Sequence, residues 1–196
     1  IVSDSPRIIN CIITGNVASS SSSYAGGIGI PGAPLYPVIS NCTIVNNSSG
    51  YGGGLSFYRP NSNQHVKIYN CLFAGNAAAI RGGAIIFAGN EADMHFGEFY
   101  NCTIAGNTNM LAGAAVAGTN AGNVLVNCIA QFNPNLAAGD VSNHQNSAYV
   151  SFTNSCTLPL PDLGAGNTDT DPLFVDLAQG DYRLAGGSPA ADAGLN

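Results

Sequence analysis

The sequence predicts an all-β chain folded as a right-handed parallel β-helix, a solenoid with three short strands in each of about five to six coils and a C-terminal cap. Three observations predict this fold. An Asn-Cys pair recurs along the chain, apolar residues alternate with other residues on both sides of each pair, and a glycine-rich segment follows at a variable distance. The cysteines lie 26 to 31 residues apart. That interval is typical of a stacked repeat, in which each unit buries its face against its neighbours.

Each Asn-Cys pair is predicted to be a bend followed by an inward-facing residue. An apolar residue lies two positions before each Asn, and another lies two positions after each Cys in the five complete copies. Two short strands therefore flank the Asn, which tolerates the left-handed backbone of a sharp bend. We expect the Asn amides to stack as a ladder and the cysteines to be free, buried thiols. The copies are Asn10-Cys11, Asn41-Cys42, Asn70-Cys71, Asn101-Cys102 and Asn127-Cys128, with a degraded copy at Asn154-Ser155-Cys156.

A second Asn column and a third strand complete the predicted coil. Five residues after each Cys another Asn recurs, at Asn16, Asn47, Asn76, Asn107 and Asn133, and we expect it to open the next turn. After a variable stretch rich in Gly, Ser and Ala, glycine turns lead into third strands at residues 26–30, 53–57, 82–86 and 112–116. The insertions at residues 58–65 and 89–95 are expected to leave the stack as loops on one side.

The chain is predicted to divide into β-helix coils over residues 1–156 and an irregular capping segment over residues 157–196. The first Asn-Cys pair has almost no unit before it, which predicts that the N-terminal end of the stack is truncated. The last coil needs cover, because an open parallel edge invites pairing with other chains. We expect this cover from Leu173, Phe174, Val175, Tyr182 and Leu184.

The composition excludes several kinds of partner. Only 8% of the residues are charged, and the net charge is -6 with five Lys and Arg. A chain of this kind offers no basic stripe for phosphates, so we expect no nucleic acid partner and no anionic membrane surface. It also contains no run of about 18 apolar residues, so we expect no direct membrane insertion. No two cysteines have the Cys-x-x-Cys spacing that favours zinc.

Two parts of the sequence resemble known surface proteins. Residues 73–76 (Phe-Ala-Gly-Asn) and 82–85 (Gly-Gly-Ala-Ile) resemble the repeats of chlamydial-type polymorphic outer-membrane proteins, although other copies replace Phe with Ile. Residues 171–194 resemble the end of secreted bacterial parallel β-helix regions that precede a surface-anchoring segment. The two resemblances imply a β-helix protein that is secreted or displayed on a bacterial envelope. They do not specify an activity, because this fold hosts adhesins, lyases, hydrolases and epimerases.

Charged residues gather before two consecutive Asn-Cys pairs. Lys67 and Glu98 each lie three positions before their Asn, so we expect them to stack as an ion pair between neighbouring coils. These groups could act as general base and acid on a uronic acid polymer, or they could form a solvated network that keeps two loops in register. The candidate catalytic residues are Arg59, His65, Lys67, Asp93, His95 and Glu98.

Aromatic and acidic residues supply further candidate sites. Tyr58, Tyr69 and Tyr100 are candidates for ligand binding, and the latter two share a repeat position and should stack outward. The stacked tyrosine rings could offer a flat face that binds a sugar ring, or their stacking could simply support strand pairing. Asn167, Asp169 and Asp171 could bind calcium, or the acidic residues could form Asx turns around a proline. No other cofactor is expected.

The favoured function is that of a non-catalytic extracellular or cell-surface β-helix, an adhesin, passenger-like or envelope structural segment. Such a segment would present its loops and its polar surface to polysaccharides or to neighbouring surface proteins. One alternative is a polysaccharide lyase, hydrolase or epimerase acting on an acidic glycan. The other is a subunit that associates end to end in an extracellular assembly through its first coil.

Overall fold

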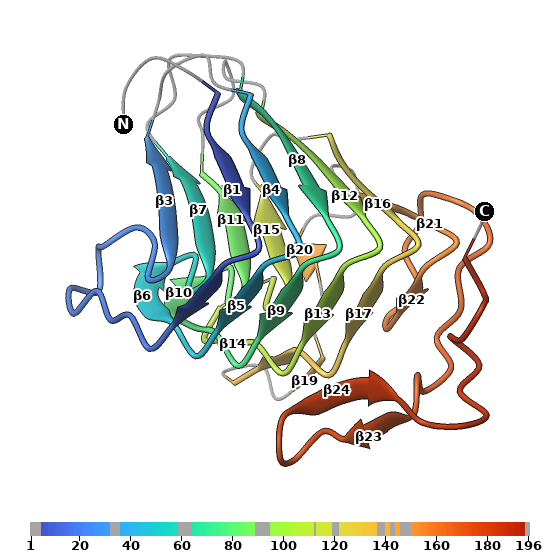
Figure 1. Cartoon of the computed structure of the whole chain (residues 1–196). Helices are drawn as coiled ribbons and strands as arrows, with labels where there is room; N and C mark the ends of the chain where they lie inside the picture. The colour runs from blue at the N-terminus through green and yellow to red at the C-terminus, as the bar shows by residue number, and fades with distance from the viewer. Residues whose placement is uncertain are drawn as a thin grey trace.

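The computed structural model is an all-β solenoid of stacked parallel strands (Figure 1), which confirms the predicted parallel β-helix. It describes residues 5–31, 36–58, 64–88, 95–111, 113–118, 122–136, 140–141, 144–145 and 150–194, with backbone alone at 64, 95, 140–141 and 144–145. This part of the chain winds through about four turns, slightly fewer than the five to six expected. It includes no helix with the length and apolarity that a membrane crossing requires.

Two sheets meet at the Asn-Cys bend. The sheet before the bend, sheet A, consists of β1 (Arg7–Ile9), β4 (Val38–Ser40), β8 (Gln64–Tyr69), β12 (His95–Tyr100), β16 (Asn123–Val126) and β21 (Val150–Thr153). The sheet after it, sheet B, consists of β2 (Ile12–Thr14), β5 (Thr43–Val45), β9 (Leu72–Ala74), β13 (Thr103–Ala105), β17 (Ile129–Gln131) and β22 (Cys156–Thr157). The two strands expected to flank each Asn are therefore present.

Two further sheets close the coil within the described residues. Sheet C contains β6 (Ser48–Tyr51), β10 (Ala77–Arg81), β14 (Thr108–Asn109), β18 (Pro134–Asn135) and the antiparallel β19 (Asp140–Val141). Sheet D contains β3 (Ile28–Pro31), β7 (Leu55–Tyr58), β11 (Ile85–Phe87), β15 (Val116–Gly118) and β20 (His144–Gln145). Sheet D corresponds to the glycine-led third strands. Sheet C adds a fourth strand to each coil, where three were expected. Its strands run through the small residues without apolar alternation that were predicted to be a variable stretch.

The core consists of stacked apolar columns, as the sequence predicts. In sheet A, Ile39, Ile68 and Phe99 occupy equivalent positions on successive coils and are completely buried. In sheet B, Ile44, Phe73 and Ile104 form a second buried column. Rows of this kind remove apolar surface from water at every coil, which is the main stabilising contribution in a structure with few charges.

The bend asparagines adopt the predicted left-handed backbone. Their φ angles are 57° at Asn10, 52° at Asn41 and Asn70, 54° at Asn101 and 53° at Asn127. Four of these side chains are exposed and that of Asn127 is half-buried. One amide contact between coils follows the expected ladder, since Asn70 Nδ2 donates to Asn41 Oδ1 at 3.2 Å.

The buried asparagine ladder lies in the other Asn column, which the sequence analysis had assigned only to the opening of a turn. Asn47, Asn76, Asn107 and Asn133 are completely buried. Asn47 Nδ2 donates to Asn76 Oδ1 at 3.0 Å, and Asn76 Nδ2 donates to Asn107 Oδ1 at 2.9 Å. Because each amide both donates and accepts, the column satisfies polar groups that would otherwise be buried without partners.

The cysteines are free, as predicted, and all except Cys11 are buried. Burial raises the pKa of Cys42, and hydrogen bonding with the Cys102 thiol, together with burial, raises the pKa of Cys71. These groups therefore remain thiols that pack as small apolar residues. In the degraded sixth copy, Ser155 takes the column position, because Cys128 N donates to Ser155 Oγ at 3.0 Å. Cys156 lies outside the column, in register with Ile129.

The last coil is closed by residues 163–170. Asn154 N donates to Ala165 O at 2.9 Å, and Thr157 N donates to Thr168 O at 2.8 Å. Asn167 Oδ1 accepts a hydrogen bond from Ser155 N at 3.0 Å and so ends the Cys column. This segment therefore supplies the cover that the sequence analysis assigned to residues further along the chain.

The next part of the tail does not cover the end of the core. Leu173 is 43% exposed and Val175 is 50% exposed, so the capping role predicted for them is wrong. The antiparallel strands β23 (Phe174–Asp176) and β24 (Asp181–Leu184) form a hairpin outside the coils (Figure 1), so the segment is not irregular throughout. The ring of Phe174 packs against Phe132 at 6.1 Å and against Tyr182 at 5.6 Å. The hairpin is thus held at the side of the β-helix.

Candidate functional site

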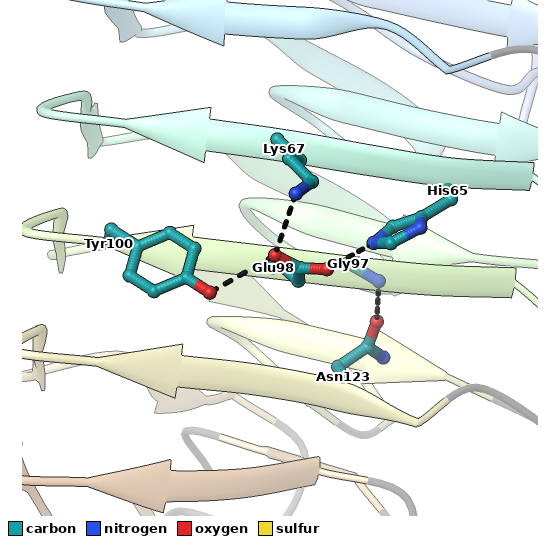
Figure 2. Close-up of polar contacts among 6 residues, drawn as sticks. All are labelled: His65, Lys67, Gly97, Glu98, Tyr100 and Asn123. Atoms are coloured by element: carbon teal, nitrogen blue, oxygen red, sulfur yellow. Dashed lines mark hydrogen bonds and ion pairs between the residues drawn. The ribbon is translucent and has the colours of Figure 1, made fainter.

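A cluster of polar and aromatic side chains lies on the outer face of sheet A, and we call it the sheet A cluster. It consists of His65, Lys67, Tyr69, Glu98 and Tyr100. Figure 2 shows four of its members, His65, Lys67, Glu98 and Tyr100. Strands β8 and β12 pair in parallel with Lys67 opposite Glu98 and Tyr69 opposite Tyr100. Alternate residues of a strand face the same side, and the intervening Val66, Ile68 and Phe99 face the core. The cluster therefore follows from the repeat.

Glu98 is the centre of the cluster. Its Oε2 atom accepts a hydrogen bond from the Tyr100 hydroxyl at 3.0 Å and lies 3.5 Å from Lys67 Nζ. Its Oε1 atom contacts His65 Nε2. The Lys67–Glu98 pair between neighbouring coils was predicted from the sequence and is confirmed.

The environment keeps Glu98 ionised. Partial burial acts to raise the pKa of Glu98, but hydrogen bonds from Tyr100 and His65 and the charges of His65 and Lys67 outweigh it, so the pKa is lowered. Burial and the bond to Glu98 raise the pKa of Tyr100. Near neutral pH the cluster therefore offers a carboxylate acceptor and a protonated phenol. A carboxylate in this state suits the binding of hydroxyl groups better than the donation of a proton.

Tyr69 and Tyr100 stack as predicted, with ring centroids 5.3 Å apart and planes 13° apart. In the same outward column, the residue opposite Tyr69 on the preceding coil is Ser40. Because serine is small, the ring face of Tyr69 that points away from Tyr100 has no large neighbour from that coil in the column. An aromatic face next to hydrogen-bonding groups is a common binding surface for ligands with both apolar and polar edges.

One other described candidate, Tyr58, does not join the cluster. Tyr58 lies on sheet D, where its ring stacks on Tyr24 with centroids 5.1 Å apart. Tyr24 also stacks on Tyr51 at 5.0 Å. Arg59, Asp93 and the side chain of His95 lie outside the described residues.

The described strands of sheet A carry a single carboxylate. Glycoside hydrolysis commonly needs two carboxylates about 5 to 9.5 Å apart. Glu98 is the one carboxylate on the described strands of sheet A. Within the described part of the chain, no three His, Cys, Asp or Glu residues form a group that could hold a metal ion.

The calcium candidates have structural roles. The Asn167 amide bonds to Ser155 N through Oδ1 and to Phe152 O through Nδ2. Asp171 Oδ1 accepts a hydrogen bond from Leu173 N at 2.8 Å, which is an Asx turn around the intervening proline. The backbone carbonyl of Asp169 accepts from Gln131 Nε2 at 3.4 Å. Of the two interpretations left open by the sequence, these contacts favour the turn.

Sequence reasoning missed two features of the outer surface. The role of Ser40 was accessible, because it occupies the same repeat position as Tyr69 and Tyr100. The stack of Tyr24 on Tyr51 had no repeat signal, because both residues lie in stretches whose length varies between copies.

Comparison with known proteins gives no family model, no curated protein and no solved structure that matches this chain.

Proposed function

We propose that this protein is a non-catalytic glycan-binding β-helix of the extracellular space or the bacterial cell surface, and that the sheet A cluster contacts the glycan. The observation that carries the proposal is the stacked pair of Tyr69 and Tyr100, in which the outer ring face of Tyr69 lies next to the small Ser40 and Tyr100 is hydrogen-bonded to an ionised Glu98. An aromatic face packs against the C–H groups of a sugar ring. The carboxylate and the half-exposed Lys67 supply an acceptor and a donor for its hydroxyls.

The composition and the resemblances support a surface location. Residues 73–76 and 82–85 resemble polymorphic outer-membrane protein repeats, and residues 171–194 resemble the end of envelope-anchored β-helix regions. The chain keeps few charges and many neutral polar side chains, which suit contact with polyhydroxylated ligands. Catalysis on an acidic glycan is the alternative function. It is less favoured, because the described strands of sheet A carry no second carboxylate beside Glu98.

Glycan-array screening followed by calorimetric titration of the bound glycan tests the proposal. Tyr69→Ala removes the open ring face, and we expect binding to weaken about two- to tenfold, because an aromatic contact contributes about 0.5 to 1.5 kcal/mol. Ser40→Leu retains the ring but fills the space beside it, and should weaken binding to a similar extent. Tyr24→Ala, at an exposed tyrosine whose ring stacks on Tyr51 of sheet C and Tyr58 of sheet D, is the matched control. Wild-type affinity in both Tyr69→Ala and Ser40→Leu, or silence of the array, would contradict the proposal.

A further inference from the structure

The C-terminal hairpin and sheet B border an open surface cavity of about 440 Å³. Its floor is formed by residues at the Asn bends and at the starts of β9 and β13, and its wall by residues 180–183 at the start of β24. Figure 1 shows the hairpin lying outside the coils. The volume is within the range of about 300 to 1,000 Å³ that is typical of small-ligand sites.

The wall of the cavity is fixed by packing. Phe174 contacts Phe132 of the last full coil, and Tyr182 packs edge-on against Phe174. The Tyr182 hydroxyl also approaches the coils closely, because a Cβ atom added at Gly106 would lie 3.0 Å from it. Ser188 Oγ donates to Pro172 O at 2.6 Å in a buried contact that fastens the end of the tail to its beginning. The cavity is therefore present before any ligand binds.

The polar groups of the lining carry no net charge. Asn70 and Asn101 contribute exposed amides from neighbouring coils, and Thr103 contributes a hydroxyl. Asp181 and Arg183 form a two-point ion pair, with Arg183 Nε 2.8 Å from Oδ1 and Nη2 2.5 Å from Oδ2. The hydrogen bonds from Arg183 lower the pKa of Asp181 to about 2, so the pair stays ionised and internally neutral. Arginine has five N–H donors, and these two bonds leave three of them for a ligand.

We infer that this cavity binds an uncharged sugar residue and extends the sheet A site around the bend, an inference that rests on the proposed function. Tyr69 precedes Asn70 in the sequence and Tyr100 precedes Asn101. The two amides therefore lie at the bend between the outer faces of sheet A and sheet B. Amides and hydroxyls both donate and accept, which matches sugar hydroxyls.

The charges favour a neutral glycan over an acidic one. The one cation among the described lining residues, Arg183, is already paired with Asp181. The whole chain carries a net charge of -6, which repels polyanions at long range. An acidic sugar would therefore give up its hydration without meeting an unpaired cation.

The test removes the cavity amides without straining the backbone. Asn70 and Asn101 have φ angles of 52° and 54°, which glycine adopts freely, so the double variant Asn70→Gly/Asn101→Gly keeps both bends. Asn10→Gly makes the same change at a bend with φ of 57° that does not line the cavity, and it leaves the bond between Asn70 and Asn41 in place. Circular dichroism establishes that each variant retains the β-helix before binding is measured.

The probes are cellohexaose, maltohexaose and hexa-N-acetylchitohexaose as neutral ligands and hexagalacturonate as the anionic one, titrated by calorimetry. At least one neutral hexasaccharide should bind more tightly than hexagalacturonate. The double variant should bind it about tenfold more weakly than the wild type, whereas Asn10→Gly should stay within about twofold. Unchanged affinity in the double variant, or tightest binding of hexagalacturonate, would overturn the inference.

The same titrations separate the two proposals. If Tyr69→Ala weakens binding and Asn70→Gly/Asn101→Gly does not, the sheet A site stands and the cavity is not part of it. If none of the four oligosaccharides binds the wild type, this inference is wrong, and the glycan array decides the proposed function.

Discussion

Replacing Asn76 with alanine should lower the free energy of unfolding more than the same replacement at any exposed bend asparagine. The reason is that the Asn76 side chain is a fully bonded member of the buried ladder. Its Nδ2 donates to Ile44 O at 2.9 Å and to Asn107 Oδ1 at 2.9 Å. Its Oδ1 accepts from the backbone and from the side chain of Asn47, both at 3.0 Å. Asn76 is not among the residues with positive φ, so alanine adds no backbone strain.

The magnitude follows from what the substitution leaves behind. The buried backbone N–H of Asn47 loses its acceptor, which costs about 1 to 3 kcal/mol. The other three hydrogen bonds of the Asn76 side chain are lost at about 0.5 to 1.5 kcal/mol each, although Asn47 Nδ2 keeps Ile13 O and Asn107 Oδ1 keeps the N–H of residue 76. These contributions add to a loss of about 2.5 to 7.5 kcal/mol, a large part of the stability of an ordinary domain.

Urea unfolding followed by circular dichroism measures this loss. The matched control is Asn16→Ala at the exposed end of the same column. Asn47 Oδ1 keeps its bond from the backbone N–H of residue 16 there, so no buried group is orphaned. The control should lose about 1 kcal/mol or less. If the two variants lost the same free energy of unfolding, the ladder would not have the stabilising role assigned to it.

Three further predictions concern the pH response, the bends and the thiols. The pKa of Glu98 is lowered in the folded state, so its ionised form stabilises the fold above the unfolded pKa of about 4.3, and this stabilisation is lost as the pH falls through the folded pKa. Tm of the wild type should therefore drop between about pH 5 and pH 3, and Tm of Glu98→Gln should drop less. A Glu98→Gln curve that superimposes on the wild type would contradict this. Asn41→Ala should lose about 1 kcal/mol in urea unfolding from its left-handed φ of 52°, and Asn41→Gly clearly less; equal losses would argue against strain at the bend. Cys11 should react with an aromatic disulfide reagent in the native state, and the other five thiols should react only after unfolding. Rapid release of more than one equivalent of the coloured aromatic thiolate from the native protein would refute the burial of those five thiols.

The repeat made most of the fold accessible from the sequence. Residues at one offset from the bend must share a column, so the inward position of Phe73 and the outward pairs Lys67–Glu98 and Tyr69–Tyr100 followed directly. The left-handed bends followed from the conformational tolerance of Asn. These predictions needed only the period and the alternation of a strand.

The features that were missed depend on contacts that leave no periodic trace. Sheet C runs through residues such as Ser49 and Gly50, which are small and show no apolar alternation, so neither the fourth strand nor the burial of the second Asn column was visible. Two Asn columns with the same period cannot be ranked by spacing alone. The position of the tail depends on the packing of Phe174 on Phe132, residues far apart in the sequence.

The candidate site was predictable in part for the same reason. Tyr58 lies close to the charged segment in the sequence but belongs to sheet D, because one coil passes through all faces of the solenoid. Sequence proximity therefore does not identify a shared face, whereas a shared offset from the repeat does.

Chemical-shift mapping identifies directly which face of the β-helix binds a glycan. An isotope-labelled sample would be titrated with the hexasaccharide that binds most tightly in calorimetry, and amide and tyrosine ring signals would be followed. The proposed glycan-binding surface predicts saturable shifts at Tyr69, Tyr100 and Glu98, continuing to Asn70 and Asn101. Shifts confined to sheet D around Tyr24 and Tyr58, with the sheet A signals unmoved, would contradict it.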